Sequence, residues 1–296
     1  MKSKYMLVLP IIAILAATLA CGRGAGITPS AQPPAAATAT ATLSATYTPD
    51  YSGPCANVLF PFVTGRQWVY QKIYVSADGA PTPTPDPLTS KFGISVKEVN
   101  GSQAILNAVD LGTGATTQTT ANCQDGAITD FPLMTLGSLF GNYLSGDIQM
   151  TYVSGIVAPS ETTLDASGWN MQWEGEYIAA GTVTLSAEGD QTTITLSDSP
   201  VRLTWQNAGQ ETVTVPAGTY ENAYKVTRTA VMDASVNVEG LVAQGTLTFE
   251  TVHWFAPYVG LLKTEITSAH LTAMGISFPI EMTGSSLELF EYHPGP

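Results

Sequence analysis

The chain has 296 residues, only 12 % of which are charged, and its formal net charge is −13. Without residues 1–20, which contain two lysines and no acid, 24 acidic residues face 9 basic ones and the net charge is −15. This excess of acid argues against nucleic acid as a partner and against electrostatic binding to anionic lipid headgroups. Attachment to a membrane would therefore have to come from an anchor, not from surface charge.

Residues 1–20 form a predicted signal peptide. Two lysines precede an apolar run of 16 residues, which is shorter than the roughly 20 residues that span a bilayer as a helix. Leu19 and Ala20 stand directly before Cys21, an order that resembles the lipobox of bacterial lipoproteins. The resemblance implies that Cys21 becomes the first residue and carries the lipid. An ordinary cleaved signal and a short uncleaved anchor are the alternatives.

Residues 21–54 are predicted to be a disordered stalk. The segment is rich in Thr, Ala and Pro and has no charged residue between Arg23 and Asp50. Such a composition has too few large apolar side chains to build a core. With acyl chains such as palmitate on Cys21, the stalk would hold the folded domain off the outer face of a bacterial cell-envelope membrane.

The two remaining cysteines, Cys55 and Cys123, are expected to form a disulfide. Export brings the chain into an oxidising compartment, where such pairing is the default. Two free, buried thiols are the alternative. Because three scattered cysteines and three scattered histidines make no ligand cluster, we expect no metal site and no cofactor.

Residues 55–293 are predicted to fold as a single β-domain. Apolar and polar residues alternate clearly over residues 182–187, 201–205 and 222–236. Strands with one apolar and one polar face are typical of antiparallel sheets, and a long sheet of this kind must cover its apolar face by curling or by packing on a second layer. The expected fold class is all-β, a curved antiparallel sheet forming a barrel or half-barrel, with one short helix.

Two local features add detail to this fold. Asn100-Gly101 joins residues 91–99 to residues 102–109, which predicts a hairpin with a type I′ turn. Residues 131–143 have apolar side chains spaced for one helical face and are the best helix candidate, expected to close one end of the sheet.

Three motifs, spread over residues 60–265, carry a resemblance. They are Phe60-Pro61-Phe62 followed by Gly65-Arg66-Gln67-Trp68-Val69-Tyr70, then Val215-Pro216-Ala217-Gly218-Thr219-Tyr220 and its continuation to Val226, and last the stretch Trp254 to Lys263 with Ala256-Pro257-Tyr258-Val259-Gly260-Leu261-Leu262-Lys263. The set resembles a group of uncharacterised bacterial envelope lipoproteins and exported β-domains of unknown function. The resemblance implies an antiparallel β fold and an envelope location, and it supplies no catalytic residue. By looser analogy such domains look like the half-barrels of lipoprotein carriers, which hold lipid in an apolar hollow.

The motifs also have a purely structural interpretation. Pro216 and Gly218 suit a turn that leads into the strand at 222–236, and Pro257 and Gly260 suit a corner between two strands. We therefore expect the stretch 254–263 to be scaffold.

No catalytic residue is predicted. His253, His270 and His293 are isolated in the sequence, and no nucleophile elbow or phosphate-binding glycine loop is present. His253 shares a strand face with Leu247 and Phe249, where a histidine with satisfied hydrogen bonds in the core is more common than a general base.

The stretch 169–177 is the best candidate for sugar binding. As a strand it would place Trp169, Trp173 and Tyr177 on one face, and such aromatic rings can stack on a glycan. The same alternation is explained equally by a core face opposite a solvent face.

The sequence leads to two hypotheses of function. The first is a non-enzymatic lipoprotein whose curved sheet binds an apolar or amphipathic ligand, such as a lipid. The side chains expected to face that ligand are Tyr224, Val226, Met232, Leu247 and Phe249. The alternative is a surface adhesion or assembly module that binds glycans or a protein partner.

Overall fold

The computed structural model describes residues 52–73, 91–131, 144–187, 190–238, 241–280 and 286–295. All of them belong to one compact unit, Thr40–Pro296. Most are in strands, and α2 (Glu161–Ala166) is the helix found in these ranges. None of the described segments forms a helix long and apolar enough to cross a membrane. In chain order the strands are β1 (Gln67–Ile73), β2 (Lys91–Asn100), β3 (Gln103–Asp110), β4 (Thr116–Gln124), β5 (Ala127–Asp130), β6 (Leu144–Gly155), β7 (Gln172–Ala187), β8 (Asp190–Val215), β9 (Gly218–Val238), β10 (Leu241–Ala256), β11 (Gly260–Ala273), β12 (Ile276–Pro279) and β13 (Ser286–His293).

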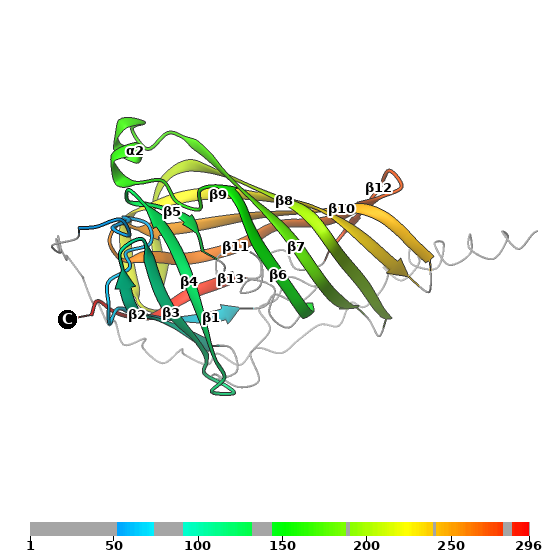
Figure 1. Ribbon diagram of the computed structural model, residues 1–296, viewed down its shortest axis with the longest axis horizontal. Helices are drawn as coiled ribbons and strands as arrows, with labels where there is room; N and C mark the ends of the chain where they lie inside the picture. The colour runs from blue at the N-terminus through cyan, green and yellow to red at the C-terminus, as the bar shows by residue number, and fades with distance from the viewer. Residues whose placement is uncertain are drawn as a thin grey trace, which may run out of the picture. The chain divides into compact units, whose positions relative to one another are not determined.

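The strands form one antiparallel sheet (Figure 1). Its order is β5-β4-β3-β2-β1-β13-β11-β10-β9-β8-β7-β6, and β12 pairs with β11 off this path. The sheet curves until its two edges meet, because Ile128 on β5 forms an antiparallel bridge with Ala158, just after β6. The result is a nearly closed barrel, and the predicted fold class is confirmed.

The last strand lies in the middle of this order. β13 pairs with β1 on one side, with Gln67 opposite His293, and with β11 on the other, with Lys263 opposite Glu288. Strands from the two ends of the domain sequence therefore lie side by side, and β13 joins β1–β5 to the rest of the sheet.

Alternation explains the faces of the long strands. On β9, Val226, Ala230, Met232 and Ala234 are buried, and Arg228 is buried on the same face. The predicted core face of residues 222–236 is thus correct where side chains are described. Because residues directly opposite in an antiparallel pair share a face, the pairing of Leu247 with Met232 and of His253 with Val226 places the matching residues of β10 on the core face too.

Two local predictions have different outcomes. The hairpin of β2 and β3 is present, but its turn lies one residue later than predicted: Asn100 is still in the ladder, opposite Gln103. A type I′ turn needs positive φ at both central residues, and only Gly101 has it, so the predicted turn type is wrong. The predicted helix over residues 131–143 lies, apart from Phe131, outside the described residues.

Residues 52–62 close one end of the sheet. Cys55 is bonded to Cys123 on β4 by a disulfide, which is the predicted pair. The buried amide of Asn57 donates to the carbonyls of Gly126 and Pro159, at 2.7 and 2.8 Å. Its oxygen accepts from the backbone nitrogens of Leu59 and Phe60. One irregular segment is thereby fixed both to β4 and β5 and to the chain that precedes α2.

Aromatic side chains fill the space beneath this segment. Phe60 meets Phe131 and Phe255 edge to face, with ring centroids 5.4 and 5.3 Å apart. Phe62 meets Phe131 in the same way at 5.3 Å. Such edge-to-face contacts are worth about 0.5–1.5 kcal/mol each beyond the burial of area, so the segment is part of the core.

The first and third sequence motifs contact each other directly. Arg66, which is buried, donates to the carbonyls of Pro61, Tyr258 and Pro294 at 3.0–3.1 Å. Trp68 donates through Nε1 to the carbonyl of Val259 at 2.7 Å. The corner between β10 and β11 is therefore held through its backbone, which agrees with its interpretation as scaffold.

The corner needs an unusual backbone. Tyr258 and Gly260 have φ angles of 62° and 112°, and a Cβ on Gly260 would lie 3.2 Å from Nε1 of Trp68. The hydroxyl of Tyr258 donates to Glu161 on α2. This hydrogen bond, more than burial, raises the pKa of Tyr258 to about 12. The corner thus connects β1, β11 and α2.

Candidate functional site

A small apolar cavity lies between residues 52–62 and the strands β1, β2, β11 and β13. Its volume is about 30 Å³; by the same measure one water molecule needs roughly 10–15 Å³, and a pocket for a drug-sized ligand has roughly 300–1,000 Å³. It can take one small group or the narrow end of a larger molecule. Residues that line it include Phe62, Tyr70, Phe92, Ile94, Leu261 and Leu287.

The polar atoms in the cavity wall already have partners. The hydroxyl of Tyr70 donates to the carbonyl of Leu261 at 3.1 Å, and Trp68 donates to Val259 as described above. Burial raises the pKa of Tyr70 far above its usual value of 10.0, so the hydroxyl keeps its proton. The remaining surface of the cavity is formed by carbon atoms, so the cavity suits an apolar group.

The residues predicted to face a ligand line the core face but are not open to one. Val226, Met232, Leu247 and Phe249 are all buried. Tyr224 is half-buried and stacks on Trp169, with ring centroids 3.6 Å apart. Val226, Met232, Leu247 and Phe249 belong to the hydrophobic core formed by the described residues, so they pack against other side chains of the protein.

A chain of buried polar side chains crosses the core face of β9, β10 and β11. Arg228 donates through Nε to the hydroxyl of Thr251 at 3.1 Å. That hydroxyl lies 2.9 Å from Nε2 of His253, and Nδ1 of His253 lies 2.8 Å from the hydroxyl of Thr264. All four residues are at most 1 % exposed. The guanidinium also lies over the ring of Trp205, 5.1 Å from its centroid.

Burial determines the charge of this network. It lowers the pKa of His253 well below the usual 6.5, with a further contribution from the nearby Arg228. It also lowers the pKa of Arg228 to about 10, which still leaves the guanidinium charged at neutral pH. His253 is thus neutral, hydrogen-bonded at both ring nitrogens and out of contact with solvent, as expected of a core histidine. The alternation of β9 in the sequence identifies Arg228 as a charged residue on an apolar face. Its contacts with Thr251 and His253 could not be predicted, because they depend on the register between β9 and β10.

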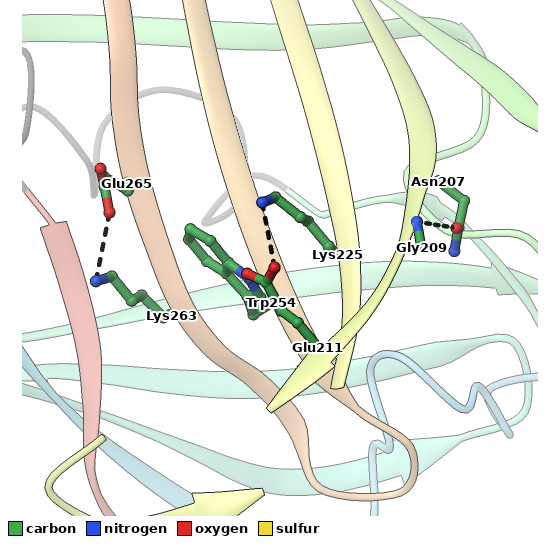
Figure 2. A network of polar contacts seen from close by, with 7 residues as sticks. All are labelled: Asn207, Gly209, Glu211, Lys225, Trp254, Lys263 and Glu265. Carbon is green, nitrogen blue, oxygen red and sulfur yellow. Dashed lines mark hydrogen bonds and ion pairs between the residues drawn. The ribbon is translucent and has the colours of Figure 1, made fainter. Parts of the chain in front are cut away.

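The outer face of the same strands carries a second polar cluster (Figure 2). Trp254 on β10 donates through Nε1 to Glu211 on β8, and Lys225 on β9 lies 3.4 Å from the same carboxylate. Nζ of Lys225 and Nζ of Lys263 each lie 5.6 Å from the centroid of the Trp254 ring. Trp254 is itself buried, so this cluster covers an indole ring and leaves no aromatic surface for a sugar.

The predicted glycan platform is divided between two environments. Trp173 and Tyr177 are buried on the core face of β7, and Nε1 of Trp173 donates to the carbonyl of Val157 at 3.0 Å. Trp169 precedes β7, has a φ of 59° and stacks on Tyr224. The three rings therefore share no exposed face, and no glycan could stack on Trp173 or Tyr177 in this structure.

Within the ranges that the structure describes, no group of three or more His, Cys, Asp and Glu side chains is placed to hold a metal ion. Cys21, the predicted lipid attachment site, lies outside the described residues. The cavity itself was not predicted, because it forms where an irregular segment packs on four strands. The only sequence signal for it is the cluster Phe60-Pro61-Phe62.

Comparison with known proteins gives one family match. A family model described as DUF3108-like matches residues 115–275, and no curated protein matches in sequence. A crystal structure from Bacteroides fragilis, of a protein described as exported and as having a YmcC-like fold, is 17 % identical with a TM-score of 0.43. A crystal structure from Parabacteroides distasonis, of a protein described as a lipoprotein, is 18 % identical with a TM-score of 0.44. Each likeness covers 80 % of this chain and 99 % of the other.

Proposed function

The chain belongs to the DUF3108-like family, and from that premise we propose that it is a non-enzymatic, lipid-anchored protein of the bacterial cell envelope that binds an apolar or amphipathic ligand. The anchor is an acylated Cys21, and the ligand places its narrow apolar end in the cavity beneath residues 52–62. The rest of such a ligand lies outside the cavity, because about 30 Å³ holds only a small group.

Two features of the sequence support the anchor. Leu19 and Ala20 precede Cys21 at the end of a short apolar run, and the following segment up to Tyr51 has almost no charge. Acyl chains contribute about 0.8 kcal/mol per buried CH₂. A lipid on Cys21 can therefore hold a chain whose acidic surface would otherwise be repelled by anionic headgroups.

The cavity wall is the observation that carries ligand binding. Aromatic and aliphatic carbon surrounds the space, and the polar atoms of Trp68 and Tyr70 are bonded to backbone carbonyls instead of pointing into it. A polar ligand would lose its hydrogen bonds to water there and gain none in return, which costs free energy. An apolar group makes no hydrogen bonds to water, so its burial in the cavity is favourable. This favours the end of an acyl chain over a sugar or an ion.

The anchor is tested by replacing Cys21 with Ser in the full chain. Labelling cells with an alkyne analogue of palmitate should mark the wild-type protein and leave Cys21→Ser unmarked. A Cys55→Ser/Cys123→Ser chain is the matched control and should be labelled like the wild type. Equal labelling of the Cys21→Ser chain would contradict the anchor.

Ligand binding is tested on the Cys21→Ser chain, which keeps every described residue. Titration with dodecanoate should shift the methyl resonances of Ile94, Leu261 and Leu287 and leave those of Leu203, a buried residue outside the cavity, in place. Leu287→Phe puts a ring where the cavity has room and should weaken binding at least tenfold.

The control is the same substitution at Leu106, a buried position of β3 away from the cavity. It should cost stability through overpacking but leave dodecanoate binding unchanged. Methyl resonances of the cavity that do not move at any dodecanoate concentration below its micelle threshold would contradict the proposal.

A further inference from the structure

Exposed apolar side chains gather at one end of the long strands. Of the seven large apolar residues that are exposed in the described chain, four lie there: Val242, Met274, Ile276 and Phe278, at 68, 82, 56 and 46 % exposure. Met274 and Gly275 form the turn between β11 and β12, and Val242 is near the start of β10. Of the four, Val242 and Met274 lie beyond the last pair of the β10–β11 ladder, Gly245 and Ala273, and Ile276 and Phe278 on β12 lie opposite Ala273 and Leu271, near the end of β11. They are called the apolar tip below.

The tip lies at the far end of the sheet from residues 52–62. Gly260, at the start of β11, packs on Trp68, and Met274 follows the end of the same strand 14 residues later. At about 3.3 Å per residue the two ends are roughly 45 Å apart. Figure 1 shows β12 at the opposite end of the sheet from α2.

The tip is held firmly to the sheet. A Cβ on Gly245 would lie 2.7 Å from the carbonyl oxygen of Thr272 and 3.2 Å from Cβ of Ala273, so β10 and β11 approach each other unusually closely just before the tip. The backbone of Ile280 donates to Ala269 at 2.8 Å, which fixes the end of β12 to β11. Met274, Ile276 and Phe278 are therefore at the end of an ordered hairpin of β11 and β12.

The tip is also free of charge in a strongly acidic chain. Residues 266–280 contain no Asp, Glu, Lys or Arg, whereas the whole chain has 24 acidic residues. His270 is the titratable side chain of that stretch, and it is half-buried beside Ser268. A neutral, apolar partner fits this surface, because nothing on it would be attracted or repelled by headgroup charge.

We infer that the apolar tip inserts into the headgroup and upper acyl region of a phospholipid bilayer. This inference rests on the proposed lipid anchor, which brings the domain to that membrane. The 31 residues from Cys21 to Tyr51 span at most about 100 Å when fully extended. That reach exceeds the roughly 45 Å between the two ends of β11, so the anchor and the tip can enter the same leaflet.

A second copy of the chain fits the tip less well. A stable protein interface buries roughly 800 Å² on each partner, and the end of one short hairpin with a neighbouring valine offers much less. Two chains that each carry a net charge of −15 without residues 1–20 also repel each other. Insertion into a neutral bilayer needs no such interface area and brings no second acidic chain close to the first.

The test uses the full lipidated chain in vesicles of phosphatidylcholine. Ser277→Cys on β12 provides one free thiol, since Cys21 is acylated and Cys55 is bonded to Cys123. It is labelled with the environment-sensitive dye NBD. Val153→Cys on β6 is the control, because Val153 is exposed to 53 % and lies away from the tip. Phosphatidylcholine brominated near the headgroup end of its chains should quench NBD at position 277 by more than half and NBD at position 153 by less than a tenth.

Substituting Ile276→Asp and Phe278→Asp together should lower the quenching at position 277 to the level at position 153. Flotation of the vesicles reports the anchor separately from the tip. A chain that floats but shows equal quenching at the two positions overturns the tip contact and leaves the anchor standing. A chain that does not float overturns the anchor and this inference with it. A blue shift at position 277 that grows with protein density, without quenching by the brominated lipid, assigns the tip to a second copy and also overturns the inference.

Discussion

At the scale of single residues, the core contains a buried histidine whose protonation changes the free energy of unfolding. His253 has no contact with solvent, and burial followed by the nearby Arg228 lowers its pKa. In the unfolded chain the same histidine takes up a proton below about pH 6.5. Protonation therefore favours the unfolded state, and the free energy of unfolding should fall as the pH drops below 6.5 toward the lower pKa of the folded state.

The size of this effect is about 1.4 kcal/mol per pH unit for one such group. Urea unfolding of the wild type between pH 5.5 and 7.5 should show that slope below pH 6.5 and a flat profile above it. His253→Gln should remove the slope whatever it does to the overall stability. His293→Gln, at an exposed position, should keep it. An unchanged slope in His253→Gln would assign the pH dependence to other groups.

Arg66 shows how one side chain holds three segments. Its guanidinium donates to Pro61, Tyr258 and Pro294 from fixed directions, and the compact ammonium of lysine cannot make all three contacts. Arg66→Lys should lower the free energy of unfolding by about 1–3 kcal/mol, since buried carbonyls lose their donors.

The matched control is Arg202→Lys. The side chain of Arg202 is 64 % exposed and lies 3.7 Å from Glu176, and such a surface ion pair, which a lysine can also form, contributes only about 0–1 kcal/mol. Urea unfolding of both variants in one buffer compares the two sites. Similar losses would mean that the contacts of Arg66 add nothing to stability.

At the scale of elements, the corner between β10 and β11 depends on Gly260. Ala at this position would bring both the strain of a φ of 112° and a Cβ only 3.2 Å from Trp68. Gly209 has a similar φ of 105° with nothing within 4 Å of the corresponding Cβ. Gly209→Ala should therefore cost about 1–3 kcal/mol through strain alone. Gly260→Ala should cost about 1 kcal/mol more, because it disturbs the hydrogen bond from Trp68 to Val259. If both variants lost the same free energy of unfolding in urea, the close packing of Gly260 on Trp68 would not contribute to the effect.

Some of these elements could be predicted from the sequence and others could not. Alternation located β7, β8 and β9, because each buries one face and exposes the other. It could not find α2, whose 6 residues are too few to show periodicity and whose one buried residue is Leu164. Its only sequence signal is the N-cap Ser160, which accepts from the backbone nitrogen of Thr163.

The candidate site was harder to predict for a related reason. The cavity forms where irregular residues 52–62 meet β1, β2, β11 and β13, and periodicity carries no information about such long-range contacts. The strand faces were correct, but alternation cannot tell whether a core face surrounds a hollow or packs solid. Val226 and Met232 lie on the predicted face, buried in the core that the described residues form.

At the scale of the whole molecule, the short strand β13 joins β1–β5 to the rest of the sheet. It lies between β1 and β11, and Leu287 and Leu289 are buried there. Such pairing of distant segments requires the closure of long loops, so folding should be slow and should need the C-terminal strand before the sheet is continuous. Without β13, the links that remain between β1–β5 and the other strands include the bridge of Ile128 with Ala158, the contacts of residues 52–62, and the side-chain hydrogen bonds from Trp68 and Tyr70 on β1 to the carbonyls of Val259 and Leu261.

This topology predicts that weakening β13 divides the sheet. Leu289→Ala should cost about 2–5 kcal/mol and should lower hydrogen-exchange protection in β1–β4 more than in β8 and β9, because the junction opens before either part unfolds. Leu203→Ala, an equally buried leucine on β8, is the matched control and should lower protection first in β7–β9. Hydrogen-exchange mass spectrometry of both variants makes the comparison. If Leu289→Ala lowered protection evenly in every strand, the sheet would be a single cooperative unit and β13 would be an ordinary strand within it.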